Sequence, residues 1–152
     1  MPPIHLANTK NKYLQLFDNQ HPTGGDTILM AGVASPQKAF RLVWQLNKSI
    51  GLHLQRVEDL YFQHKKGEDI YIQCFEYTDV EYEYTYRLIA NKTSNNILIP
   101  EHKNTNYFLL VKGDMQNEGW QLLLGNMKRM TFALTVYEVH LLDLKNKDYL
   151  YF

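Results

Sequence analysis

The chain has 152 residues, enough for one domain, and 45% of them are hydrophobic against 21% charged, as in ordinary globular proteins. Sixteen basic and 16 acidic side chains give zero net charge, which argues against a protein that coats nucleic acid or anionic lipid. The single cysteine, Cys74, excludes an intrachain disulfide and favours a reducing compartment, so we expect a cytoplasmic protein.

Residues 1–26 predict a loosely ordered N-terminal extension, because proline, asparagine and glycine recur throughout them. We assign residues 27–152 to a single α+β domain. No apolar run follows a basic start, so we expect no signal peptide. The longest apolar runs are far shorter than the roughly 20 residues of a membrane span, so no membrane association is expected.

Residues 26–33 predict a buried strand that is apolar on both faces, followed by a helix. Ser35 is the expected N-cap, with Pro36 at the first helical position and Gly51 as the C-terminal stop. Apolar residues at helical spacing predict the buried side of this helix: Ala39, Phe40, Val43, Trp44, Leu46 and Ile50. Trp44 is then a core residue whose replacement by alanine would cost about 3–5 kcal/mol.

After Gly51 the hydrophobic period changes to two, which predicts strands over residues 52–61, 70–77 and 80–90, with a turn at 78–79. The last of these strands alternates apolar and polar positions, as in an antiparallel strand with one wet face. Tyrosines 77, 82, 84 and 86 form an unusual row. We expect the last three to cover the core beneath a helix.

Four further elements are predicted: a strand at 97–99 ended by Pro100, a strand at 107–112, a helix from 115 to about 128, and a strand at 131–139. Asp114 is the expected cap of that helix. The fold class is therefore α+β, with a mixed or largely antiparallel sheet of about six strands and two helices packed on one face. The apolar end, residues 149–152, should dock on the domain or on a second copy of it.

No catalytic motif is present, and we predict no catalytic residue, no metal and no cofactor. The six histidines are scattered, without zinc-ligand spacing. Cys74 lies in phase with Ile70 and Ile72, which predicts a small buried hydrophobe rather than a catalytic thiol. The candidate ligand position is Gly32 and Ser35, where a strand leads into a helix whose N-terminal N–H groups favour an anion.

Ile99-Pro100-Glu101, with Tyr107 six residues further on, resembles the motif of the bacterial IPExxxVDY family, which has no assigned function. Thr105 and Asn106 stand where the motif has valine and aspartate. If the aspartate of the motif were a catalytic base, Asn106 could not replace it, because an amide takes up no proton in the range a general base needs. Either this member is inactive or the motif residues have a structural or interaction role. We predict that Glu101 anchors its loop by accepting hydrogen bonds from backbone N–H groups.

These observations favour a non-enzymatic protein-binding or adaptor domain, whose partner is another protein or a second copy of the chain. The alternatives are a small-ligand-binding regulatory domain resembling the ACT type, an RNA-contacting accessory protein and, last, an enzyme. Glu81 and Glu83 adjoin the tyrosine row and would repel phosphate, which disfavours nucleic acid as the partner.

Overall fold

The computed structural model describes residues 27–63, 67–145, 147 and 150–152, which form a six-stranded sheet and two helices. The predicted α+β fold class is confirmed. The predicted extension, residues 1–26, lies outside the described residues. Within the described chain, neither helix is long and apolar enough to cross a membrane.

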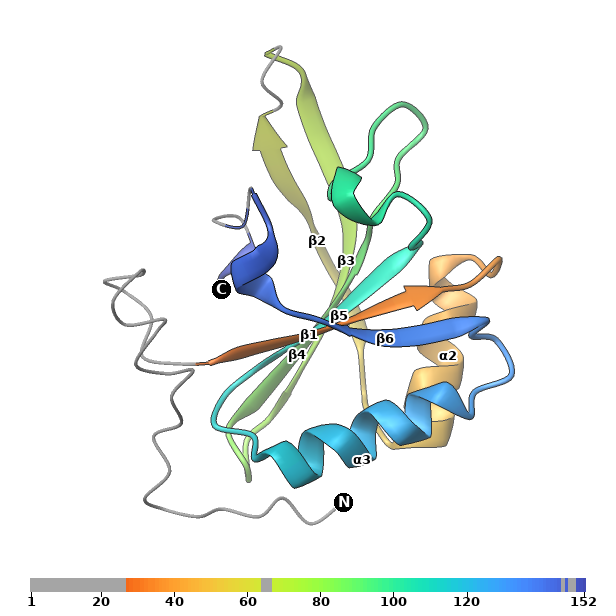
Figure 1. Ribbon diagram of the computed structural model, residues 1–152, viewed down its shortest axis with the longest axis vertical. Helices are drawn as coiled ribbons and strands as arrows, with labels where there is room; N and C mark the ends of the chain where they lie inside the picture. The colour runs from red at the N-terminus through yellow and green to blue at the C-terminus, as the bar shows by residue number, and fades with distance from the viewer. Residues whose placement is uncertain (1–26, 64–66, 146, 148–149) are drawn as a thin grey trace.

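The strands form one antiparallel sheet in the order β2-β3-β4-β5-β1-β6. Their bounds are β1 (Ile28–Ala34), β2 (Gln55–Gln63), β3 (Asp69–Asp79), β4 (Tyr84–Ala90), β5 (Tyr107–Lys112) and β6 (Thr135–Val139). In Figure 1, β2 and β3 run almost vertically whereas β1 and β6 run almost horizontally, so the sheet is strongly twisted. The β2–β3 hairpin extends beyond both helices.

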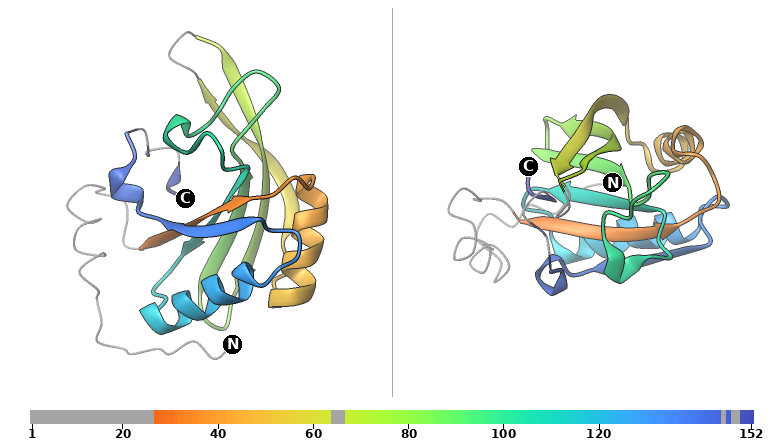
Figure 2. Two further views of the ribbon diagram at one scale, coloured as in Figure 1. Left: turned by 45° about the vertical axis from the view of Figure 1, so that its right-hand side comes forward. Right: turned by 90° about the horizontal axis from the view of Figure 1, so that it is seen from above.

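Two amphipathic helices, α2 (Ala39–Ile50) and α3 (Asn117–Lys128), cover one face of the sheet (Figures 1 and 2). Leu42 and Leu46 of α2 and Trp120 and Leu123 of α3 are fully buried there. They join one cluster with alternate residues of the strands, because successive strand residues point to opposite faces.

The opposite face is covered by two short 3-10 helices, η1 (Pro100–His102) and η2 (Leu141–Asp143), and by the C-terminal residues. Leu150 is buried in this second cluster, and the Arg87 guanidinium lies 4.0 Å from the centre of the Phe152 ring. The predicted docking of the C-terminal end therefore occurs within one chain. Tyr149, which belonged to that prediction, lies outside the described residues.

The predicted buried side of α2 is wrong at two positions. The side chains of Phe40 and Trp44 are 63% and 55% exposed, so Trp44 is not a core residue and Trp44→Ala should not cost 3–5 kcal/mol. The side that contacts the sheet instead holds Ala39, Leu42, Val43, Gln45 and Leu46. Gln45 tolerates burial because its Nε2 donates to Thr131 Oγ1 and its Oε1 accepts the N–H of Phe132.

The start of α2 also differs from the prediction. The N-cap is Lys38 rather than Ser35, and the helix begins at Ala39. The Ser35 hydroxyl donates to the carbonyl of Phe132 at 2.5 Å, so it ties the β1–α2 connection to the segment before β6. It accepts the N–H of Gln37, which lies before the helix begins.

The turn between β3 and β4 lies two residues later than predicted. β3 continues through Asp79, and residues 80–83 form the turn, with Val80 exposed to solvent. Asp79 Oδ1 accepts the N–H groups of Glu81 and Tyr82, at 3.1 and 3.3 Å, and this local acceptor favours a turn. Tyr84 and Tyr86 are buried on the helix-covered face, as predicted.

Other boundaries were also predicted incorrectly. β2 runs from Gln55 to Gln63 instead of over residues 52–61. Residues 97–99 make a single bridge, between Ile97 and Lys92, instead of a strand. α3 is capped by Gln116 rather than by Asp114. β6 begins at Thr135 instead of at residue 131, because residues 131–134 form the turn that brings the chain back beside β1.

Candidate functional site

The groups at the predicted anion position, Gly32 and Ser35, contact other parts of the protein itself. The N–H of Ser35 donates to Asn106 Oδ1 at 2.8 Å, and Ser35 is buried. Gly32 lies within β1, where a Cβ atom would stand 2.7 Å from the Tyr137 ring. Gly32 is thus required for close packing of that ring, and the donor proposed for an anion already has a protein acceptor.

The motif residues have structural contacts. Ile99 is buried, and the Tyr107 hydroxyl donates to the carbonyl of Gln37 at 2.5 Å, which links β5 to the start of α2. Pro100 opens η1. Glu101 accepts the N–H of Lys145 at 3.1 Å, as predicted for a loop anchor, and this hydrogen bond lowers the pKa of its carboxyl group.

The sequence analysis missed Asn91, which holds the motif loop together. Its side chain is fully buried, and its Nδ2 donates to the carbonyls of His102 and Thr105 at 2.9 and 2.8 Å. Its Oδ1 accepts the N–H of Ile99 at 2.8 Å. An asparagine after a strand ordinarily indicates an exposed turn, so the sequence carried no signal for this role.

Cys74 is buried in β3, as predicted, and burial raises the pKa of its thiol to about 11. At pH 7 only about one thiol in ten thousand is then ionised, and the thiolate is the reactive form.

We expect Cys74 of the native protein to react with a neutral-pH thiol reagent at least about a hundredfold more slowly than the same cysteine in denaturant. The time course of labelling by mass spectrometry, with and without guanidinium, measures this ratio. Equal rates would mean that the β3 thiol is accessible and that its assignment to the core is wrong.

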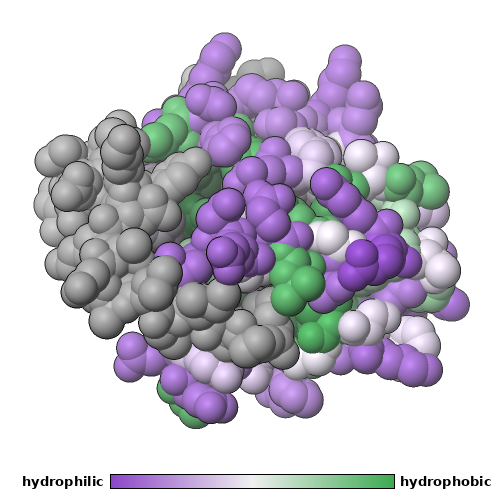
Figure 3. Space-filling model, turned by 60° about the horizontal axis from the view of Figure 1, so that its bottom comes forward, coloured by the Kyte–Doolittle hydropathy of each residue, from purple (hydrophilic) through white to green (hydrophobic). Residues whose placement is uncertain are grey.

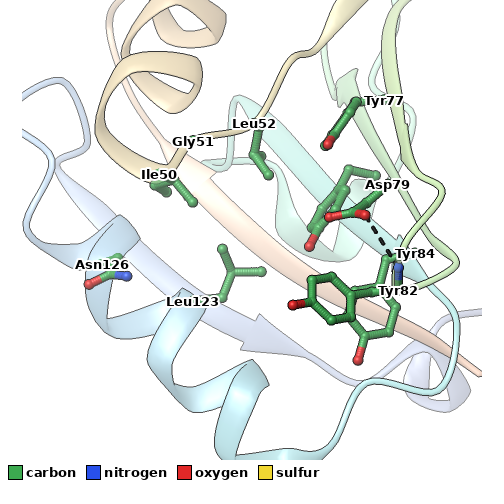
Figure 4. Close-up of a pocket in the computed structure, with 10 residues that line it drawn as sticks. Ile50, Gly51, Leu52, Tyr77, Asp79, Tyr82, Tyr84, Leu123 and Asn126 are labelled. Carbon is green, nitrogen blue, oxygen red and sulfur yellow. Dashed lines mark hydrogen bonds between the residues drawn. The ribbon is translucent and has the colours of Figure 1, made fainter. Parts of the chain in front are cut away.

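A pocket of about 100 Å³ lies where the C-terminal end of α2, the middle of α3 and the β3–β4 hairpin meet (Figure 4). Four tyrosines of the hairpin line it, and we call it the tyrosine pocket: Tyr77, Tyr82, Tyr84 and Tyr86. The helices contribute apolar walls, which include Ile50 and Leu123. At the lower end of the molecule, hydrophobic side chains form small groups among hydrophilic ones on the part not drawn in grey (Figure 3).

The charge of the tyrosine pocket is negative. Asp79 contributes a carboxylate to its lining, and no lysine, arginine or histidine stands among the described lining residues. Burial raises the pKa values of the Tyr77, Tyr84 and Tyr86 hydroxyls, and the charge of Asp79 raises them further. Tyr77, Tyr84 and Tyr86 are therefore neutral at physiological pH.

A second feature is the outward side of α2, which we call the α2 surface: Phe40, Arg41, Trp44 and Lys48, with Phe132 beside them. The Trp44 and Phe132 rings are 6.4 Å apart. Lys48 Nζ lies 4.8 Å from the Trp44 ring, and the Arg41 guanidinium lies 5.7 Å from the Phe132 ring. Aromatic residues and arginine are enriched at protein interfaces, so this combination of exposed side chains is a candidate interaction surface.

A groove of about 460 Å³ runs between the start of α2 and strands β2 and β3. Its walls carry Lys38, Phe40, Arg56 and Phe75. Residues 27–57, which supply most of this side, contain four lysines and arginines and no acidic residue. The α2 surface and its groove are therefore both aromatic and basic, although the whole chain is neutral.

No family model matches the chain, and no curated protein matches it significantly.

In the part of the chain that the structure describes, no three histidine, cysteine, aspartate or glutamate side chains come together as a metal site would require. The tyrosine pocket and the α2 surface are the candidate sites among the described residues.

Proposed function

We propose that this protein is a non-enzymatic protein-binding domain whose α2 surface docks an acidic segment of a partner protein. The observation that carries the proposal is the exposure of Phe40 and Trp44, at 63% and 55%, on one side of a helix. Large aromatic side chains together with arginine dominate the binding energy of protein interfaces. Exposed apolar patches that are rimmed by polar residues mark interaction sites.

The charges of this side determine the chemistry of the partner. Lys38, Arg41 and Lys48 surround the aromatic rings, and α2 has no acidic residue in its first turn. An acidic segment with an apolar anchor would satisfy both the cations and the exposed rings.

A partner protein is favoured over nucleic acid because the positive charge is sparse. Arg56 is paired with Asp59 at 2.6 Å, which reduces the field that a phosphate backbone would meet. Nucleic-acid binding without sequence preference depends on several phosphate contacts and a strong positive field. The experiment below must therefore distinguish a protein partner from an RNA partner.

The same proposal includes a cytoplasmic location, which the single buried thiol suits, and membership of the IPExxxVDY family, which rests on the matched motif residues.

A second copy of the chain is the other protein partner to consider. The alternative of a small-ligand-binding regulatory domain is supported by the tyrosine pocket, at the C-terminal end of α2.

We expect a photo-reactive phenylalanine analogue placed at Phe40 to crosslink a specific protein in nuclease-treated cell extract. Trp44→Ala and Arg41→Glu should each reduce the yield of that adduct by about tenfold or more, because they remove an aromatic anchor and reverse a charge. Mass spectrometry of the adduct identifies the partner and the acidic segment that carries the crosslink.

Two controls make the result specific. The same analogue at Leu122, an exposed residue of α3, should give no such adduct, and Lys128→Glu should leave the yield from position 40 unchanged. An adduct that disappears with nuclease would identify RNA and contradict the proposal. An adduct with the chain itself would identify a homodimer instead of a separate partner.

A further inference from the structure

The tyrosine pocket is a second site, separate from the α2 surface, and four tyrosine rings of the β3–β4 hairpin form one side of it. The Tyr77 and Tyr86 rings lie 5.8 Å apart and nearly parallel, with 11° between their planes. The Tyr82 and Tyr84 rings form another near-parallel pair at 6.2 Å, with 25° between planes. Tyr84 meets Tyr86 edge-on, at 89°, so the two pairs present ring faces in two directions.

The position of Asp79 is fixed. Its Oδ1 accepts the N–H groups of Glu81 and Tyr82, so the carboxylate is held by the turn (Figure 4). After burial, its charge further raises the pKa values of Tyr77 on the same strand and of Tyr86 on β4. Arg129, the C-cap residue that follows α3, donates to Asn126 Oδ1 from an exposed position.

An aromatic pocket that contains a carboxylate selects for positive charge. The face of each ring is negative, so it attracts a cation within about 6 Å and repels an anion. Asp79 adds a full negative charge close to the rings. A primary ammonium group would lose strong hydration on entering such a pocket, whereas a methylated ammonium group is less hydrated and brings apolar methyl groups to the rings.

We propose that the tyrosine pocket binds a methylated ammonium group. Its volume of about 100 Å³ corresponds to about three water molecules at roughly 30 Å³ each, which suits a headgroup of a few heavy atoms and not a drug-sized ligand. The group belongs either to a small organic cation such as choline or to a methylated lysine side chain of a protein. Both carry the same chemistry and differ in what is attached to it.

The test is a titration of the labelled full chain with tetramethylammonium, choline and the uncharged carbon analogue of choline, followed by amide chemical shifts. We expect both cations to shift residues of the β3–β4 hairpin and the end of α2, and the uncharged analogue to bind at least about tenfold more weakly. Equal binding of the uncharged analogue would overturn the proposal, because it would show an apolar pocket without charge selection. So would the absence of shifts with either cation at millimolar concentrations.

Two variants locate the site, with a matched control. Asp79→Asn keeps the Oδ1 acceptor of the turn but removes the charge, and it should weaken cation binding by about tenfold. Tyr77→Leu removes a partly exposed ring and should weaken it similarly, and amide spectra establish that each variant remains folded. Glu118→Gln, which neutralises an acid in the first turn of α3 outside the lining, should change nothing. Unchanged binding by both pocket variants would place the cation elsewhere and refute the assignment.

The source of the ammonium group is resolved in the same experiment by adding a trimethyl-lysine peptide and its unmodified form. Tighter binding of the trimethylated peptide than of choline supports a modified protein as the ligand, and equal binding supports a free small cation. Equal binding of the two peptides contradicts selection for methylation. Trp44→Ala should leave all these affinities unchanged. The proposal for the α2 surface and the proposal for the tyrosine pocket can therefore be refuted separately.

Discussion

Replacing Trp120 by alanine should lower the free energy of unfolding by about 3–5 kcal/mol. Trp120 is 1% exposed and is among the largest fully buried side chains of the described chain. Its indole Nε1 donates to Glu138 Oε2 at 2.7 Å, which joins α3 to β6. The truncation therefore leaves a cavity between helix and sheet, and it also leaves a partly buried carboxylate without its donor.

Chemical denaturation measures this loss, and the second tryptophan supplies the control. Trp44→Ala removes the same side chain from an exposed position and should cost less than about 1 kcal/mol. Trp120→Phe, which keeps most of the packing and loses the hydrogen bond, should fall between the two. Equal effects at positions 44 and 120 would contradict the burial assigned to α2 and α3.

Asn91→Asp should destabilise the protein by about 3–5 kcal/mol although it changes a single atom. The carboxylate keeps an acceptor for Ile99 N–H but loses both donors, so the carbonyls of His102 and Thr105 would face a buried negative charge. Because the site is fully buried, water cannot replace the lost donors without opening the motif loop.

Thermal melts at neutral pH give the overall effect, and hydrogen exchange of the Ile99 amide reports on the loop itself. Asn95→Asp in the same connection places the same charge at an exposed position and should change stability by less than about 0.5 kcal/mol. If Asn91→Asp melts like the wild type and Ile99 N–H stays protected, the buried network does not hold the loop.

The alternation of side chains predicted much of the sheet because it follows directly from strand geometry. β5 was predicted with both of its ends correct, and the placement of Tyr84 and Tyr86 beneath the helices was correct. The buried side of α2 was not, because α2 has apolar residues on two adjacent sides and periodicity alone does not rank them. The contact with the sheet selects the side that holds Leu42 and Leu46.

The candidate sites were less predictable, because they depend on residues that meet only in three dimensions. The tyrosine row was visible in the sequence, but the predicted turn at 78–79 hid the fact that Asp79 shares a pocket with Tyr77 and Tyr82. The two exposed aromatic residues of α2, Phe40 and Trp44, were predicted from the sequence to be core residues. Asn91 gave no sequence signal, since its partners are backbone groups between Ile99 and Thr105.

The interior position of β1 in the sheet, between β5 and β6, has a consequence for synthesis on the ribosome. β1 is the first described strand, yet it pairs with β5 and β6, which are synthesised much later. Ile28 cannot pair until Lys112 has been made, and Met30 cannot pair with β6 until Val139 has been made. Strands β2, β3 and β4 pair with their neighbours in sequence and need no such delay. A nascent chain that stops before Tyr107 therefore carries an apolar strand with both edges open, and such fragments should aggregate or recruit chaperones.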